Sequence, residues 1–225
     1  MTFSIAALDR ASGMFGIAVA SSSIAVGNRC PWARAGVGAV LTQHRTDIRS
    51  GPLGLQLLAG GLSARETVEV LARSNDQPRL RQFAAIDSQG RTAFFNGPGI
   101  ESINGAHEGD ACISAGNFLA DAHVTCAMVK GYESAPQLPF VERLLAGLDA
   151  GVSAGGETQP AMAAALLVVD RQAWPLVDLR VDFEPQPERT LRRLWTAYVP
   201  VLDRFVKQVL EPDVLKPLIH SPLTI

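Results

Sequence analysis

The order of strand-like and helix-like segments is the feature that most restricts the folds open to this chain. A strand pair comes first, followed by a helix pair, several strands, a second helix pair, a second strand pair and a final helix. Strands and helices therefore fall into separate blocks and do not alternate as they do in parallel βαβ units. We predict an α+β fold with two sheets covered by helix pairs, a four-layer αββα sandwich.

The strand segments follow from the spacing of apolar residues. Phe3, Ile5 and Ala7 alternate with small or polar neighbours, and the alternation returns from Phe15 after a turn over residues 9–13, which predicts an N-terminal hairpin. Further strands are expected over residues 35–43, 81–87, 92–95, 111–115, 161–169 and 177–182. The run at 161–169 is aliphatic throughout, which indicates a strand that is buried on both faces.

Helices are expected where apolar residues recur at helical spacing. They cover residues 52–59, 63–73, 121–133, 138–150 and 187–210, with an interruption at Pro200. Ser63 and Glu66 form a capping-box pattern, which fixes the start of the second helix. No repeat or long linker divides the 225 residues, so we expect one domain over residues 1–225.

The C-terminal segment, residues 194–225, is expected to be a helix and an apolar tail that docks or makes a dimer contact. Hydrophobic residues make up 47% of the chain and charged residues only 19%, which suggests more apolar surface than one small domain buries. The tail supplies apolar side chains at Leu210, Val214, Leu215, Leu218 and Ile219. We therefore predict a homodimer.

Charge and composition exclude several classes of protein. A net charge of −2 lacks the positive field that nucleic-acid binding requires, so no nucleic-acid partner is expected. The uncharged run 11–28 contains serines and glycines at strand spacing and is interpreted as a strand and loop, so no membrane partner is expected. Asp9 lies where a secretion signal would be apolar, and Cys30, Cys112 and Cys126 are too scattered for a disulfide framework, which favours a cytoplasmic location.

No cofactor or metal is indicated by the motifs. Nucleotide, dinucleotide, zinc-protease and calcium patterns are absent from the sequence. The four histidines, His44, His107, His123 and His220, are far apart, and none forms a helical ligand pair with a neighbouring acid. Each is more simply explained as a solvated or hydrogen-bonded side chain.

Thr2 is the most informative candidate for chemistry, because it stands at the head of a buried strand. Removal of Met1 would give one residue both a hydroxyl and a free α-amine, and the amine can then act as the base for the hydroxyl. Ser21, Ser22 and Ser23 end the partner strand, where their hydroxyls can face this residue. A small second residue and a polar strand end are also common without any catalytic role.

Other polar residues at strand ends are candidates for the same site. Arg34 can place a positive charge beside the amine and keep it neutral, or form a surface ion pair. Asn117 can donate to a developing oxyanion, or cap a helix. Thr42 and Gln43 can line a pocket, or mark where a strand reaches solvent.

Seven segments together resemble the bacterial family called domain of unknown function 1028, which is grouped with the N-terminal nucleophile (Ntn) hydrolases. They match the patterns M-T-x-S-I at 1–5, A-V-A-S at 18–21, P-W-A-R-A-G-V-G-A-V at 31–40, T-Q at 42–43, G-L-x-L-L-A-x-G-L-S-A at 54–64, G-N-x-L-A at 116–120 and V-D-L-R-V-D at 177–182. The resemblance extends to about Arg193. It departs at Ser50-Gly51, where Tyr-Gly is expected, and at Phe183-Glu184, where a more polar pair is expected.

The resemblance implies an αββα sandwich and hydrolysis of an amide bond. Thr2 takes the nucleophile position, Ser21 or Ser22 the polar partner, and Arg34 the basic position, where proteasome subunits have a lysine. Arginine supplies charge but does not exchange a proton at ordinary pH. Thr42, Gln43, Gly116 and Asp182, which lie within the matched segments, are the residues that we expect to bind substrate.

Two functions remain open from the sequence. The first is an Ntn-type amidohydrolase or peptidase that cleaves a small amide or peptide, with Thr2 attacking the carbonyl and Asn117 or a backbone amide stabilising the oxyanion. The alternative is an inactive Ntn-like fold that binds a ligand or assembles with a partner. Retention of Met1 favours the alternative, because Thr2 then has no free amine.

Overall fold

The fold contains two antiparallel sheets in a computed structural model that describes residues 1–214. The larger sheet has the order β10-β9-β2-β1-β8-β7. Its strands are β10 (Val177–Val181), β9 (Ala163–Val169), β2 (Phe15–Ser21), β1 (Thr2–Leu8), β8 (Cys112–Asn117) and β7 (Asn104–Gly109). The smaller sheet contains β3 (Pro31–Arg34), β4 (Gly38–Gln43), β5 (Gln82–Asp87) and β6 (Thr92–Asn96) in that order.

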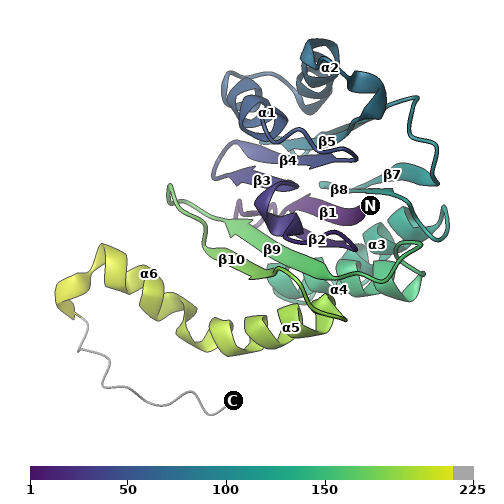
Figure 1. Cartoon of the computed structure of the whole chain (residues 1–225). Coiled ribbons are helices and arrows are strands. Elements are labelled where there is room, and N and C mark those ends of the chain that lie inside the picture. The colour runs from purple at the N-terminus through teal and green to yellow at the C-terminus, as the bar shows by residue number, and fades with distance from the viewer. Residues whose placement is uncertain (215–225) are drawn as a thin grey trace.

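Helices cover the outer face of each sheet (Figure 1). Helices α1 (Ser50–Ala59) and α2 (Ala64–Ser74) lie on the four-stranded sheet, and α3 (Val124–Glu133) and α4 (Phe140–Ser153) lie on the six-stranded sheet. Helix α5 (Pro187–Tyr198) packs against β9 and β10 and leads to α6 (Leu202–Leu210). Short 3-10 turns lie at Val26–Asn28, Pro78–Leu80, Val199–Val201 and Pro212–Val214.

Alternation along β1 divides its side chains between two apolar layers. Phe3, Ile5 and Ala7 point toward α3 and α4 and join the largest apolar cluster. Ala6 and Leu8 point toward the other sheet and join a cluster between the sheets. A third cluster lies between the four-stranded sheet and helices α1 and α2. Because neighbouring residues of a strand face opposite ways, Thr2 and Ser4 also face the space between the sheets.

Most predicted segments are confirmed with shifted ends, and two strands were missed. The capping box at Ser63 and Glu66 is present, with both hydrogen bonds formed. The strand predicted over 35–43 is shorter, because residues 35–37 form the turn between β3 and β4. Strand β3 has four residues including a proline, and β7 has the sequence NGAHEG with one apolar residue, so neither showed an apolar pattern.

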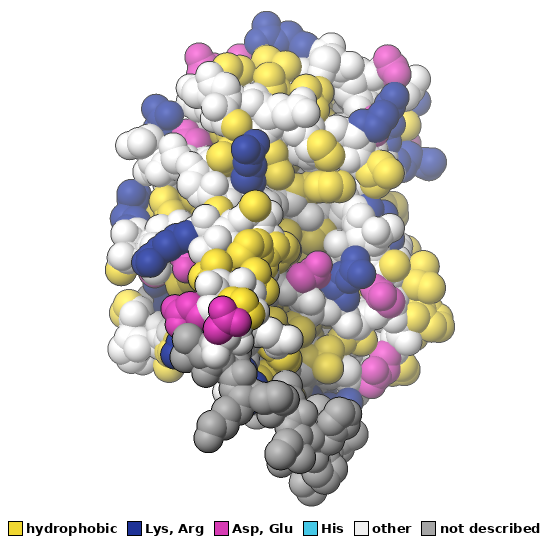
Figure 2. All heavy atoms as spheres, turned by 90° about the vertical axis from the view of Figure 1, so that its left-hand side faces the viewer, with side chains coloured by type: hydrophobic (Ala, Val, Ile, Leu, Met, Phe, Trp, Pro, Cys, Tyr) yellow, Lys and Arg dark blue, Asp and Glu magenta, His cyan; other side chains and the backbone are white. Residues whose placement is uncertain are grey.

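The face on the left of Figure 1 has a central band of apolar side chains with charged side chains around it (Figure 2). Helix α6 exposes Phe205, Val209 and Leu210. Leu215, Leu218 and Ile219 lie outside the described residues, as does the side chain of Val214, so the homodimer stays a prediction. No helix within residues 1–214 is both long and apolar enough to cross a membrane.

Candidate functional site

Thr2 lies in the middle of the larger sheet, at the end of β1 where the chain begins. It is 4% exposed and is paired with Asn117 of β8. Its hydroxyl donates to the carbonyl oxygen of Met1, and the Ser21 hydroxyl donates to the same oxygen at 2.6 Å. Two hydroxyl groups from neighbouring strands therefore meet on the carbonyl of the residue that acylates the Thr2 nitrogen.

Ser22 and Glu157 form the wall beside Met1. The Ser22 backbone N–H donates to Glu157 Oε2 at 3.0 Å, and the Ser22 hydroxyl lies 3.3 Å from the Met1 sulfur. Burial raises the pKa of Glu157 and lowers the pKa of the Met1 amine, and the attraction between these two groups opposes both shifts. Glu157 and the chain's amine thus share one buried neighbourhood, where charge is costly unless it is paired.

A polar network crosses from one sheet to the other beside Thr2. Gln82 Nε2 donates to Asn96 Oδ1 and to the Gly116 carbonyl, both at 2.8 Å, which leaves Gln82 Oε1 as an acceptor. Asn117 Nδ2 donates to this oxygen at 2.9 Å. The orientation of the Asn117 amide is therefore fixed, and its Oδ1 is a buried acceptor without a partner in the described chain.

The same end of the space between the sheets holds further unpaired acceptors. Gln43 Nε2 donates to Ser4 Oγ at 2.6 Å, and Gln43 Oε1 has no partner within residues 1–214. Glu157 Oε1 is likewise buried and unpaired there. Buried polar atoms normally find a partner, so unpaired acceptors near Thr2 indicate a place for N–H or O–H donors.

A cleft of about 670 Å³ opens from Met1. It is lined by Met1, His44, Arg45, Arg79, Leu80, Gly99, Glu101, Ser102 and Phe118. His44, Arg45 and Phe118 all have positive φ angles, between 45° and 54°, although none is a glycine. Such backbone conformations cost energy and concentrate at functional sites. Three of them around one cleft, where β4 and β8 end, point to function.

His44 forms the inner wall of this cleft. Its ring stacks on Phe118 at 5.6 Å, and its Nδ1 lies 2.7 Å from the Leu80 carbonyl oxygen. Burial lowers the pKa of His44, so the ring is neutral at neutral pH. A neutral ring held by a carbonyl presents Nδ1–H to that carbonyl and leaves Nε2 as an acceptor.

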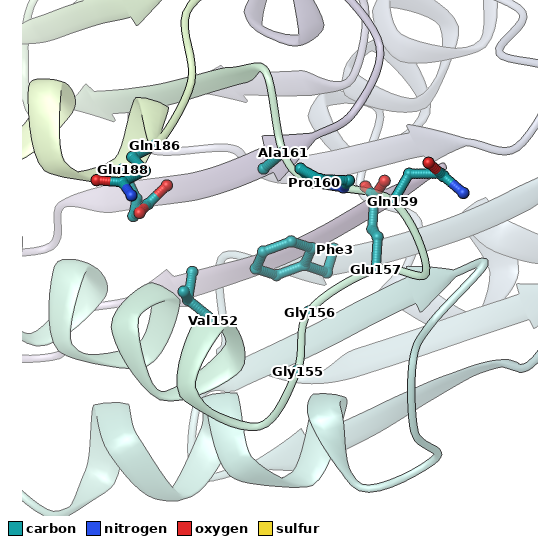
Figure 3. Close-up of a pocket in the computed structure, with 10 residues that line it drawn as sticks. All are labelled: Phe3, Val152, Gly155, Gly156, Glu157, Gln159, Pro160, Ala161, Gln186 and Glu188. Atoms are coloured by element: carbon teal, nitrogen blue, oxygen red, sulfur yellow. The ribbon is translucent and has the colours of Figure 1, made fainter.

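A smaller hollow of about 190 Å³ lies on the other side of β1 (Figure 3). The Phe3 ring lies at its centre, with Glu157 on one side and Glu188 on the other. Glu157 thus separates this hollow from the Met1 site. Gln159 and Gln186 are the other polar side chains in its lining.

Arg34 is not part of the site, contrary to the sequence-based expectation. It pairs with Gly38 at the far end of β3, whereas Cys30, at the near end, accepts a hydrogen bond from Thr42 N. Four residues of extended chain place Arg34 about 13 Å away from that end. Arg29 is nearer the N-terminus: it lines the hollow that contains Met1 and Thr2, and its charge adds to burial, the larger cause, in lowering the pKa of the Met1 amine. Arg29 Nη1 donates to the carbonyls of Ile24 and Ala25.

The other predicted residues divide between the site and elsewhere. Ser21, Ser22, Gln43 and Asn117 come together around Thr2, as described above. Asn117 does not cap a helix, because α3 begins after His123. One of the two N–H groups of its Nδ2 donates to Gln82 Oε1, so the predicted donation to an oxyanion would have to come from the other.

Thr42, Gly116 and Asp182 do not present side chains to the site. The Thr42 hydroxyl donates to the Arg29 carbonyl and accepts from Trp32, on the face turned toward the helices. Gly116 contributes only its carbonyl, to Gln82. Asp182 is exposed, and its carbonyl accepts from Ala25 N.

Sequence reasoning missed Ser4, Gln82, Arg29, Arg45 and Glu157. Ser4 and Gln82 occupy inward positions of otherwise apolar strands, a signal that the sequence does contain. Glu157 follows α4 in a loop with no pattern of its own, so only the tertiary structure brings it to Met1. Cys30 also lies nearby, but burial raises the pKa of its thiol, which makes it a poor nucleophile.

Comparisons with known proteins agree on the family. Residues 2–191 match the model described as "Family of unknown function (DUF1028)". The crystal structure of protein SPO2555 from Silicibacter pomeroyi, described with the same family, shares 31% identity, covers 88% of this chain and 89% of its own, and superposes with a TM-score of 0.82. No curated protein matches the sequence.

Two more distant structures are of proteins called Anbu. The Anbu (Gly-1) mutant from Hyphomicrobium sp. strain MC1 is 12% identical, covers 94% of this chain and 100% of its own, and has a TM-score of 0.41. Anbu (ancestral beta-subunit) from Yersinia bercovieri is 12% identical, covers 97% and 100%, and has a TM-score of 0.39. At these scores they assign nothing further. From the match over residues 2–191 and the likeness to SPO2555, this chain belongs to the DUF1028 family.

Proposed function

We propose that this chain is an Ntn-type amidohydrolase or peptidase that cleaves an amide bond in a small molecule or peptide. Thr2 is the nucleophile, and it becomes active when the bond to Met1 is cleaved. The proposal includes the finer fold assignment, in which helices, two sheets and helices form the αββα sandwich of these enzymes. Apolar clusters between the sheets and under both helix pairs support that assignment.

The observation that carries the proposal is the contact of two hydroxyls with one carbonyl. The Thr2 and Ser21 hydroxyls both donate to the Met1 carbonyl oxygen. Met1 is an acyl group on the Thr2 nitrogen, and only two carbons, Cα and Cβ, separate that nitrogen from Thr2 Oγ1, the atom that would carry the acyl group of a substrate. A substrate's acyl group attached to Thr2 Oγ1 therefore occupies neighbouring space, with Ser21 in reach of its oxygen.

The reaction follows from the groups present. Thr2 Oγ1 attacks the substrate carbonyl carbon while its proton passes to the Thr2 α-amine. The C–N bond then breaks, the leaving amine takes that proton, and an ester remains on Thr2. Water adds to the ester carbonyl with the amine as base, which releases the acid and restores the hydroxyl.

Neighbouring residues have distinct parts in this scheme. The Ser21 hydroxyl donates to the carbonyl oxygen as negative charge develops on it. Asn117 Oδ1 is free to accept an N–H from the new amine, which orients its lone pair toward the hydroxyl. Burial is the main cause that keeps the amine neutral, as it is for the amine of Met1, and the positive charge of Arg29 adds to it.

The second candidate function is ligand binding without catalysis. The observation in its favour is the polar cleft that opens from Met1, because it forms without any reaction at Thr2. For as long as Met1 stays attached, it acylates the Thr2 nitrogen and contacts Ser21 and Ser22. An acylated nitrogen cannot accept the hydroxyl proton. In that case the cleft beside Met1 binds a polar ligand and no ester forms.

A labelling experiment separates the two functions. Full-length protein is produced as a cleavable fusion that exposes Thr2, and as a form that retains Met1, and each is treated with a β-lactone or an activated amide. Intact mass and peptide mapping should show acylation of Thr2 only in the exposed form. Thr2→Ala should abolish the label and Thr2→Ser should keep part of it, because serine retains both groups.

Thr92→Ala on β6 is the matched control and should label like the wild type. A label on Ser4, Ser21 or Cys30 in the Met1-retaining form would place the nucleophile elsewhere. Failure of every form to react, in protein that binds a ligand in the cleft, would favour the binding function.

A further inference from the structure

We infer that the cleft beside Thr2 binds a carboxylate, so that the substrate is a small amide or peptide with a free carboxylate group. The inference rests on the proposed function in one respect, namely that the substrate contains an amide bond that Thr2 cleaves. The carboxylate site itself needs no catalysis, because it is formed by Arg45 and Arg79 in the folded chain.

The proposed carboxylate site comprises two adjoining hollows, the cleft described above and a smaller hollow at its inner end next to Thr2. The outer one, of about 670 Å³, contains Arg45 and Arg79, and the inner one, of about 420 Å³, contains Thr2, Arg29 and Arg45. They share Met1, His44 and Arg45. Arg45 therefore lies at the junction, between the proposed nucleophile and the outer opening.

The charge of the lining is positive. Three arginines line the two hollows, and the one acidic residue among the lining residues is Glu101. His44 adds no charge at neutral pH, because burial lowers its pKa. The chain as a whole has a net charge of −2, so the charge of this surface is opposite in sign to that of the whole chain. A concave surface of one sign attracts the opposite charge.

Arg45 and Arg79 also lack partners of their own. Within residues 1–214 neither guanidinium forms an ion pair or a side-chain hydrogen bond, whereas Arg91 and Arg192 are paired with acids. The five N–H donors of a guanidinium match the two oxygens of a carboxylate. Two unpaired guanidinium groups at one cleft thus supply N–H donors that have no acceptor within residues 1–214.

The remaining wall suits the rest of such a substrate. Ser102 Oγ accepts from Phe118 N at 3.0 Å, which leaves the hydroxyl proton free to donate into the cleft. The stacked rings of His44 and Phe118 offer an apolar surface. Glu101 on the rim repels a second anionic group, so the cleft suits one carboxylate per ligand better than two.

Binding is measured by calorimetry on full-length Thr2→Ala protein with residue 2 exposed, so that turnover does not interfere. The probes are the dipeptide Ala-Ala with its free carboxylate and the same dipeptide amidated at that end. We expect the free carboxylate to bind at least tenfold more tightly. Arg45→Gln and Arg79→Gln should each remove most of that preference.

Arg34→Gln is the matched control, since it makes the same change at the far end of β3. Equal affinity for the two dipeptides, no binding of either, or an equal loss with Arg34→Gln would each overturn the inference. So would inorganic phosphate that competes as strongly as the dipeptide, because the site would then be a general anion site.

Kinetics on the Thr2 protein distinguish this inference from the proposed function. If the enzyme turns over, Arg45→Gln should raise KM for the free carboxylate substrate by tenfold or more and leave kcat and the amidated substrate nearly unchanged. Tight, Arg45-dependent binding without any turnover would refute the proposed hydrolysis and leave the carboxylate site standing. Turnover that is unchanged by Arg45→Gln and by Arg79→Gln would refute the carboxylate site and leave the proposed hydrolysis standing.

Discussion

The space between the two sheets has an apolar half and a polar half, built from the same strands. Strand β1 contributes Ala6 and Leu8 to the apolar half and Thr2 and Ser4 to the polar half. Strand β5 likewise contributes Ile86 to the first and Gln82 to the second. All are buried. The backbone pairing is continuous through both halves, so only the side chains differ.

The difference shows where stability and where chemistry reside. Apolar contacts lower the free energy of folding without specific partners, whereas each buried polar group needs a hydrogen bond to offset its lost hydration. The polar half leaves Gln43 Oε1 and Asn117 Oδ1 without protein partners within residues 1–214. A fold selected only for stability gains nothing from this arrangement. The polar half is therefore where a ligand is expected.

The largest change in stability should follow Leu41→Ala in the apolar half. Leu41 is 0% exposed and packs between the sheets, so truncation leaves a cavity and should cost about 2–5 kcal/mol. Urea unfolding measures the loss. Reactivity of Thr2 toward the acylating probe should persist well below the melting temperature. If the variant is fully folded but Thr2 is no longer labelled, packing in the apolar half must be required for chemistry in the polar half.

Gln82→Leu should have the next largest effect, because it removes one of the hydrogen-bonded links between the sheets in the polar half. The Asn117 amide and the Gly116 carbonyl lose their partner, and stranded buried groups cost about 1–3 kcal/mol. Here labelling of Thr2 should fall as well, since Asn117 is no longer held. The exposed Gln89→Leu is the control. A change in stability without any change in labelling would make the network purely structural.

Glu157→Gln should change how stability depends on pH. Burial raises the pKa of Glu157 above its ordinary 4.5, so the folded chain keeps a proton that the unfolded chain releases. Stability therefore falls as pH rises from about 4.5 through the folded-state pKa. The glutamine variant has no proton to release, so this fall should disappear from a series of melting curves. Glu101→Gln, at the exposed rim, should keep the wild-type profile.

Arg34→Ala should have the smallest effect, within about 0.5 kcal/mol and with normal labelling, because the side chain is exposed and distant from Thr2.

Arg29→Ala is the variant to compare with Arg34→Ala, because it removes the arginine that lies near Thr2. It removes hydrogen bonds to Ile24 and Ala25 and should cost about 1 kcal/mol while reducing the reactivity of the exposed Thr2 amine at neutral pH. The reverse ranking would restore Arg34 to the basic position.

Local patterns were enough for much of the fold. The hairpin of β1 and β2, the second hairpin of β5 and β6, and the capping box of α2 each depend on residues close together in the chain. They were predicted because hydrophobic period and cap chemistry act over a few residues. Strands β3 and β7 were missed, because edge strands with one buried face or none carry little apolar pattern.

The sequence by itself determined most of the elements, the buried faces of the strands that it predicted and the position of Thr2 at the head of β1. Only the tertiary structure decided which polar groups meet there. The sequence pointed to Arg34 for the basic position, but the direction of β3 places Arg34 at the end of the strand away from the N-terminus and leaves Arg29 in the hollow that contains Met1 and Thr2. Glu157 comes from a loop 155 residues after Thr2 along the chain. Contacts between such distant segments depend on how the sheets stack, and no local pattern encodes that.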